Sequence, residues 1–206
     1  MRSCLCSERL VHTQYRTPAG RLQPRRGHTV VEMLIVMSLM AALAGIAMPR
    51  LNYSAMRLDA NVRVVRSAFQ QAWRAAIQTQ HDMLVSMDTA AKRIRIVEDV
   101  NNDGLPSPGE RVTWRPLEEG AVFDVPAAGV SGPVTTSVSG PGVKSVQGMP
   151  TITFRRNGST SGDVELYLSI RYRSVKEFRG VTVAQATGRT EWFRRVNGSW
   201  WRSGGI

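Results

Sequence analysis

Residues 30–48 read VVEMLIVMSLMAALAGIAM and hold a single charged side chain, Glu32, among 19 residues. A helix of this length extends about 28 Å, close to the hydrocarbon thickness of a bilayer. Basic residues precede the run, namely Arg16, Arg21, Arg25 and Arg26. Because the cytoplasmic flanks of membrane segments carry an excess of Lys and Arg, the sequence predicts that residues 1–27 stay in the cytoplasm and that the rest is exported.

Glu32 decides among three interpretations of this run. A secretory signal has a shorter apolar region followed by a small-x-small cleavage site; Gly45-x-Ala47 offers such a site, but an acid inside the apolar region fits it poorly. A simple membrane anchor has no use for a carboxylate whose burial near the bilayer centre costs about 2.5–3.5 kcal/mol. No basic residue inside the run can pair with Glu32, so the third interpretation supplies a partner from another chain.

The third interpretation rests on the residues around Gly27. The segment 27–34, GHTVVEML, resembles the class III signal of type IV pilins and pseudopilins. The resemblance implies that a prepilin peptidase cuts after Gly27 and methylates the new N-terminus at His28, a position where the family usually has Phe or another apolar residue. Glu32 then becomes the fifth mature residue, which in the family faces the N-terminal amine of a neighbouring subunit. Each buried charge neutralises the other.

The same resemblance implies a location and a set of partners. We expect a single-pass protein of the bacterial inner membrane, with its N-terminus in the cytoplasm and its C-terminal domain in the periplasm. The expected partners are the prepilin peptidase and other pilin or pseudopilin subunits. The filament would be a type II secretion pseudopilus or a type IV pilus, and the sequence does not choose between them.

The pattern of apolar residues predicts an α+β fold, and the resemblance implies that it is pilin-like. It also implies one long N-terminal helix, bent or loosened at Pro49, with a transmembrane, assembly half at 28–49 and an amphipathic half at 50–82. Steps of three and four residues mark the apolar face of the second half, at Leu51, Ala55, Leu58, Val62, Val65, Phe69, Ala72 and Ala76. Residues 83–206 show two-fold periodicity and frequent turns, which predict an antiparallel β-sheet domain that packs on this helix.

Strands are expected in that domain at 83–88, 92–98, 111–115, 121–125, 150–156, 163–170, 179–186, 190–196 and 199–202. Residues 126–148 are dense in glycine and proline, which predicts a long surface loop. The C-terminal part is similar to the GspH/FimT-like branch of minor pseudopilins. This similarity rests on TITF at 151–154, NG at 157–158, VELYL at 164–168, VTV at 181–183 and TGR at 187–189.

Residues 99–110, DVNNDGLPSPGE, match the spacing of a calcium-binding loop. The expected Ca²⁺ ligands are Asp99, Asn101, Asp103, Glu110 and, through its carbonyl, Leu105. A tight turn at Gly104 would aim these oxygens at one point, as a hard cation requires. Expected strands on both sides, in place of two helices, favour an ordinary acidic hairpin turn instead. Both interpretations stay open, and a membrane-anchored calcium-binding domain outside any filament is an alternative function.

The net charge of +11 is concentrated in two blocks, with +5 in residues 1–27 and +6 in residues 155–206. In the second block Arg189, Arg194 and Arg195 alternate with tryptophans, as sequence-tolerant DNA binding requires. Some FimT-like minor pilins bind DNA during uptake through a basic C-terminal segment, in which Gly-Arg is followed by a further Arg. Glu191 interrupts that pattern here. The two interpretations are a DNA-binding minor pilin and a solvated basic surface.

Catalysis is not expected. Cys4 and Cys6 both lie in the predicted leader, so the mature chain would have no cysteine and would fold without disulfides. The histidines that remain are His28 and His81, and no nucleophile or acid motif surrounds them.

Overall fold

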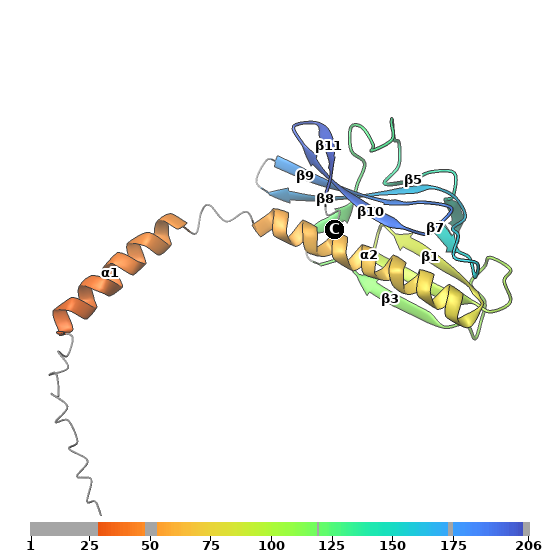
Figure 1. Cartoon of the computed structure of the whole chain (residues 1–206), viewed down its shortest axis with the longest axis horizontal. Helices are drawn as coiled ribbons and strands as arrows, with labels where there is room; N and C mark the ends of the chain where they lie inside the picture. The colour runs from red at the N-terminus through yellow and green to blue at the C-terminus, as the bar shows by residue number, and fades with distance from the viewer. Residues whose placement is uncertain (1–28, 48–52, 119, 173–174, 204–206) are drawn as a thin grey trace, which may run out of the picture. The chain divides into compact units, whose positions relative to one another are not determined.

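The computed structural model describes residues 29–47, 53–118, 120–172 and 175–203. The predictions for the leader 1–27, for His28 and for Pro49 therefore lie outside the described residues. The chain divides into two units, residues 1–50 and 51–206, and each is described by itself. Helix α1, Val30–Ala47, belongs to the first unit, and every other described element belongs to the second (Figure 1).

Helix α1 begins with a side-chain cap. The Glu32 N–H donates to Thr29 Oγ1 at 3.2 Å, and the Met33 N–H donates to the Thr29 carbonyl at 3.1 Å. Thr29 is therefore the N-cap residue. In the part of the chain that the structure describes, no helix has both the length and the hydrophobicity that crossing a membrane requires.

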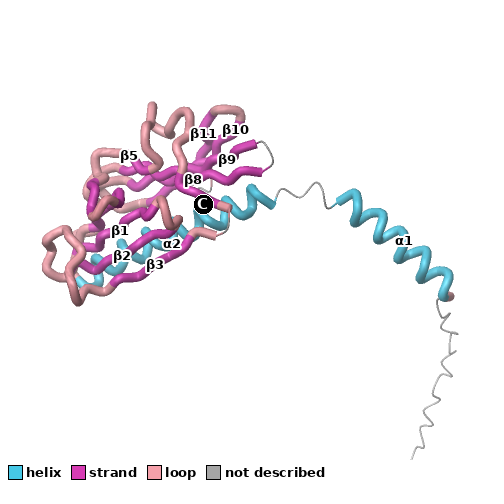
Figure 2. Tube along the Cα trace, turned by 180° about the vertical axis from the view of Figure 1, so that it is seen from behind, coloured by secondary structure: helices cyan, strands magenta, loops and turns pink. Residues whose placement is uncertain are grey.

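Helix α2, Tyr53–Thr79, packs its apolar face on both sheets of the second unit. Each residue of this face has at most 2% of its surface exposed: Leu58, Val62, Val65, Ala68, Phe69, Ala72 and Ala76. Six of these positions were predicted from the spacing of apolar residues, so the predicted face is confirmed. Figures 1 and 2, which view the molecule from opposite sides, both show α2 lying along the sheets.

The second unit contains two antiparallel sheets. The first has the order β3-β2-β1-β7-β6, with β1 at Asp82–Asp88, β2 at Arg93–Asp99, β3 at Val112–Pro116, β6 at Lys144–Val146 and β7 at Met149–Phe154. The second has the order β11-β10-β9-β8-β4, with β4 at Ala121–Phe123, β8 at Val164–Tyr172, β9 at Val175–Val183, β10 at Thr190–Val196 and β11 at Ser199–Arg202. A short strand, β5 at Val138–Ser139, also pairs with β8. The predicted α+β class, a helix packed on antiparallel sheets, is confirmed.

Directly opposed residues of an antiparallel pair lie on the same face of a sheet. Leu166 of β8 and Trp192 of β10 both lie opposite Val181 of β9, and these three side chains contribute to the core beneath α2. Arg179 and Arg194 are also opposed and so share this face. The arginines of the second sheet are thus distributed between its two faces by strand alternation.

Two predictions for this domain differ most from the structure. Residues 126–148 are not one loop, because they contain β5 and β6, whose Val138 and Val146 are 4% and 7% exposed. Single buried valines between glycines and prolines have no periodicity, so these short strands could not be recognised. Strand β9 begins at Val175, earlier than the predicted 179, because it pairs with β8 along its whole length.

Candidate functional site

Helix α1 is apolar on all its sides. Exposed fractions between 46% and 78% are found for Val30, Val31, Met33, Leu34, Ile35, Val36, Met37, Leu39, Met40 and Leu43. The hydroxyl of Ser38 donates to the Ile35 carbonyl at 2.8 Å and is satisfied within the helix. An amphipathic helix would show one apolar stripe, whereas a helix that is apolar all round is covered on every side by other apolar groups.

Glu32 lies in the first turn of α1, three residues after the Thr29 cap. A carboxylate at this end of a helix is favoured by the partial positive charge of the unpaired backbone N–H groups. The Thr-x-x-Glu spacing is also that of a capping box. The acid is therefore placed at the N-terminal end of the apolar surface and not in its middle. Gly27 and His28, the predicted cleavage and methylation residues, lie outside the described residues.

A second candidate site is built around Trp73 of α2. The Trp73 Nε1–H donates to the Gly158 carbonyl at 2.9 Å. Gly188, in the turn between β9 and β10, packs on the same indole with φ at +62°; a Cβ there would lie 2.5 Å from Trp73 Cδ1. Arg189 is the next residue in the chain. The contact between Gly188 and Trp73 therefore fixes the position of the Arg189 backbone relative to α2.

This packing gives a testable result for Gly188→Ala. We expect the substitution to lower the free energy of unfolding by about 2 kcal/mol or more, since it adds the cost of a left-handed backbone to a clash with the indole. Gly198→Ala is a matched control, because Gly198 has φ at +84° but a Cβ there would have no atom within 4 Å. Urea unfolding of both variants measures the difference. Equal losses of stability in the two variants would contradict the proposed contact.

A pocket of about 400 Å³ lies beside Trp73, between α2 and the turn before β10. Arg66 and Arg74 line it from α2, while Arg189 and Arg202 line it from the C-terminal part of the chain. Among the described residues of the lining, Glu191 is the one acid; it accepts a hydrogen bond from Arg202 and lies 3.5 Å from Arg189 Nε. The lining therefore has a strong excess of positive charge.

Sequence reasoning missed the contribution of α2 to this pocket. Four residues of α2 line the pocket. Gln70, Trp73 and Arg74 follow Arg66 by four, seven and eight residues, a spacing that places all four on one face of a helix. This face borders the apolar one. The spacing could have identified a shared surface, but the C-terminal arginines that complete the pocket are brought to it only by the tertiary fold.

The three arginines predicted to bind DNA do not form one surface. Arg189 lines the pocket, and 67% of its side chain is exposed. Arg194 and Arg195 are consecutive in β10 and therefore face opposite sides of the sheet. The guanidinium carbon of Arg195 lies 5.9 Å from the ring centres of both Phe178 and Trp200. DNA binding stays a prediction, and two of its three residues, Arg194 and Arg195, face opposite sides of the sheet.

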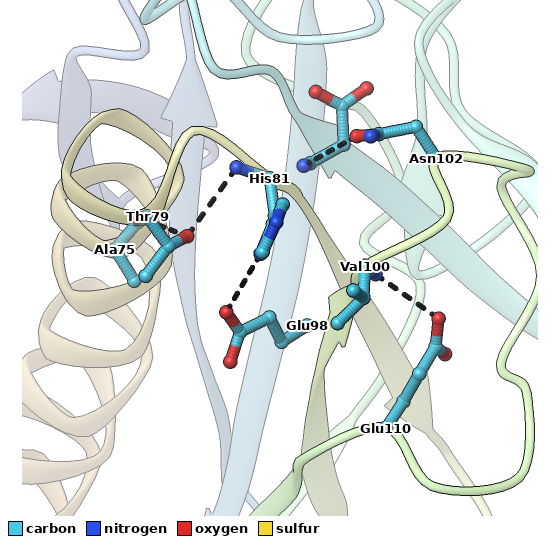
Figure 3. Close-up of polar contacts among 8 residues, drawn as sticks. Ala75, Thr79, His81, Glu98, Val100, Asn102 and Glu110 are labelled. Carbon is cyan, nitrogen blue, oxygen red and sulfur yellow. Dashed lines mark hydrogen bonds and ion pairs between the residues drawn. The ribbon is translucent and has the colours of Figure 1, made fainter.

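The loop 99–110 is closed by its own carboxylates. Asp99 accepts hydrogen bonds from the N–H groups of Asp103 at 3.1 Å and Gly104 at 2.8 Å. Glu110 accepts from the N–H groups of Val100 at 3.1 Å, drawn in Figure 3, and Ser107 at 2.8 Å. The predicted calcium ligands Asp99, Asp103 and Glu110 thus lie in one loop, but their carboxylates face backbone donors.

The remaining predicted ligands lie in the same loop. The Asn101 side-chain amide donates to an Asp103 carboxylate oxygen at 2.8 Å, and the Leu105 N–H donates to the other at 2.7 Å. Among the described residues, no group of three or more His, Cys, Asp or Glu side chains is arranged to hold a metal ion. Calcium binding therefore stays a prediction, which thermal unfolding in excess calcium and in chelator would decide.

Asp99 is the buried acid of this loop, with 1% of its surface exposed. Burial raises its pKa; the amides of Gly104 and Asp103 oppose this effect, and the neighbouring carboxylates of Asp103 and Glu110 add to it. A raised pKa means that the folded protein holds this proton more tightly than the unfolded chain does. The contribution of Asp99 to stability is thus greatest at acidic pH and is lost as the pH rises through its raised pKa.

His81 joins the end of α2 to β2 (Figure 3). Its Nδ1 lies 3.0 Å from Glu98 Oε1, and its backbone N–H donates to Thr79 Oγ1 at 3.4 Å. The Thr79 hydroxyl in turn donates to the Ala75 carbonyl at 3.0 Å. These bonds close the C-terminal turn of the helix and tie it to the first sheet, and we assign them a structural role.

Comparison with known proteins identifies the N-terminal segment. Residues 22–48 match the family model of the prokaryotic N-terminal methylation motif, which covers the predicted cleavage site and all of α1. The predicted type IV pilin-like signal is confirmed by this match. A search of the curated proteins found no match. Among solved structures, the chain is similar to the minor pseudopilin EpsH from the Type 2 Secretion System of Vibrio cholerae. The identity is 16% and the TM-score 0.44, over 67% of this chain and 97% of that chain.

Proposed function

We propose that this protein is a minor pilin or pseudopilin, a non-catalytic subunit of a type IV pilus or a type II secretion pseudopilus. The observation that carries the proposal is the methylation motif at residues 22–48, which coincides with a helix that is apolar on every side. In this proposal a prepilin peptidase removes residues 1–27 and methylates His28. The second unit then stands in the periplasm of a bacterial cell.

The physical role of α1 follows from its surface. Before assembly the bilayer of the inner membrane covers the exposed apolar side chains, and the run 30–48 is long enough in sequence to occupy the hydrocarbon layer. After assembly the helices of neighbouring subunits replace the lipid. Neither environment offers water to a carboxylate, so Glu32 needs a cation beside it, and the amine created at His28 of a neighbouring subunit supplies one.

Coexpression with a prepilin peptidase tests this proposal. We expect the intact mass to fall by residues 1–27, with one methyl group added at His28. We expect Gly27→Glu to block the change, because the cut in the pilin-like family depends chiefly on this glycine. Gly20→Glu is the matched control within the leader and should be processed normally. Retention of residues 1–27 in the presence of active peptidase, or a cut near Ala47, would instead identify an anchored or a secreted domain.

A further inference from the structure

The pocket beside Trp73 has unbalanced positive charge. Four arginines and one glutamate line it, and Glu191 is engaged with the two arginines of the C-terminal part, Arg189 and Arg202. In the described part of the chain, neither Arg66 nor Arg74 forms an ion pair, and the buried Arg66 Nε has no hydrogen-bond partner. An arginine without a counter-charge in a pocket favours the binding of an incoming anion.

We propose that this pocket binds a carboxylate-bearing side chain from an acidic segment of a partner protein. The guanidinium fork matches the two oxygens of a carboxylate. On one side of the pocket Glu191 already pairs through Oε1 with Arg202 and Arg189. The second pair, Arg66 and Arg74, is left for the incoming group. Trp73 and Trp192 also line the pocket and offer apolar walls to the methylene groups of a Glu or Asp side chain.

Charge distribution favours a protein carboxylate over a nucleic acid. A strand of nucleic acid needs basic groups along a track that follows its backbone. Here the basic groups converge on one pocket, while Arg194 and Arg195 face opposite sides of the sheet. The pocket also spans two segments that are distant in sequence, and the contact between Gly188 and Trp73 holds them together.

A neighbouring filament subunit is the natural source of such a segment, and that part of the inference rests on the proposed function. The pocket itself does not depend on it, because its residues belong to the second unit and not to α1. Binding of an acidic peptide and cleavage after Gly27 are therefore separate measurements. Either can fail while the other succeeds.

The test uses the full-length chain in nonionic detergent and a fluorescent polyglutamate peptide with blocked ends. We expect saturable binding by fluorescence anisotropy that weakens with added salt. Arg66→Gln and Arg74→Gln should each weaken binding by about tenfold or more, because each removes a charge-assisted hydrogen bond. The matched controls are Arg63→Gln, one turn from Arg66, and Arg194→Gln. Neither residue lines the pocket, so each control should change the affinity by less than about twofold.

Three results would overturn the proposal. The first is no binding of the peptide; the second is equal loss of affinity in pocket and control variants, which identifies nonspecific charge attraction. The third is a single-stranded oligonucleotide of equal charge that binds more tightly than the peptide and loses affinity in Arg194→Gln, which identifies a nucleic-acid surface. Circular dichroism of each variant checks that the fold is kept. Arg66→Lys keeps the positive charge but loses the guanidinium fork, so it should retain part of the affinity for the peptide.

Discussion

Replacing Glu32 with alanine should leave cleavage after Gly27 intact and should abolish incorporation into filaments. The side chain lies in the first turn of α1, and the residue needed for the cut lies before the helix, so the two events involve different groups. In a filament core the N-terminal amine of a neighbouring subunit would be buried. Without a carboxylate beside it, that amine would lose its counter-charge in an apolar environment, a loss of about 3–5 kcal/mol when one partner of a buried pair is removed.

The measurement is the amount of processed protein in sheared filament fractions relative to the membrane fraction. Ser38→Ala is the matched control, because Ser38 is also a polar residue of α1 but bonds only to its own helix. We expect this control to assemble normally. If Glu32→Ala assembles as well as Ser38→Ala does, the proposed pairing of Glu32 with a neighbouring amine is wrong. If neither the unaltered chain nor the variants enter the filament fraction, the chain is an anchored domain outside any filament.

The features that could be predicted from the sequence are those that depend on short-range periodicity. The buried face of α2 was predictable because Leu58, Val62, Val65 and Phe69 recur every three or four residues and all lie against the sheets. The N-terminal signal was predictable because residues 27–34 resemble the pilin signal and because a lone acid in an apolar run has few physical explanations. Both features lie within one continuous stretch of sequence.

The features that could not be predicted depend on contacts between distant segments. Arg66 and Arg189 line one pocket only because Gly188 packs on Trp73, and no local pattern connects α2 with the turn before β10. Arg189, Arg194 and Arg195 look like one basic cluster in the sequence. Strand alternation and the position of the turn separate them, and this separation needs the register of β10 against β9.

Asp59→Ala should destabilise the second unit more than a typical surface substitution does. Arg179 is 1% exposed and points from β9 toward α2, where its Nε donates to Asp59 Oδ1 at 2.6 Å. Its other partners are weaker, since Glu177 Oε2 lies 3.6 Å from Nη2 and the Phe178 carbonyl accepts from Nη1 at 3.0 Å. Removing Asp59 therefore leaves a buried cation only partly compensated.

We expect Asp59→Ala to lower the free energy of unfolding by about 3 kcal/mol, the lower end of the cost of removing one partner of a buried pair, because Asp59 itself is 31% exposed. Arg179→Met should cost less, since it replaces the buried cation with an apolar side chain of similar length and leaves the carboxylate partly in water. The double variant should then be more stable than Asp59→Ala alone, because the uncompensated charge is gone. Urea unfolding of the three variants, followed by tryptophan fluorescence, gives the coupling energy. Additive losses would show that the two residues act independently and that the pair does not hold α2 on the second sheet.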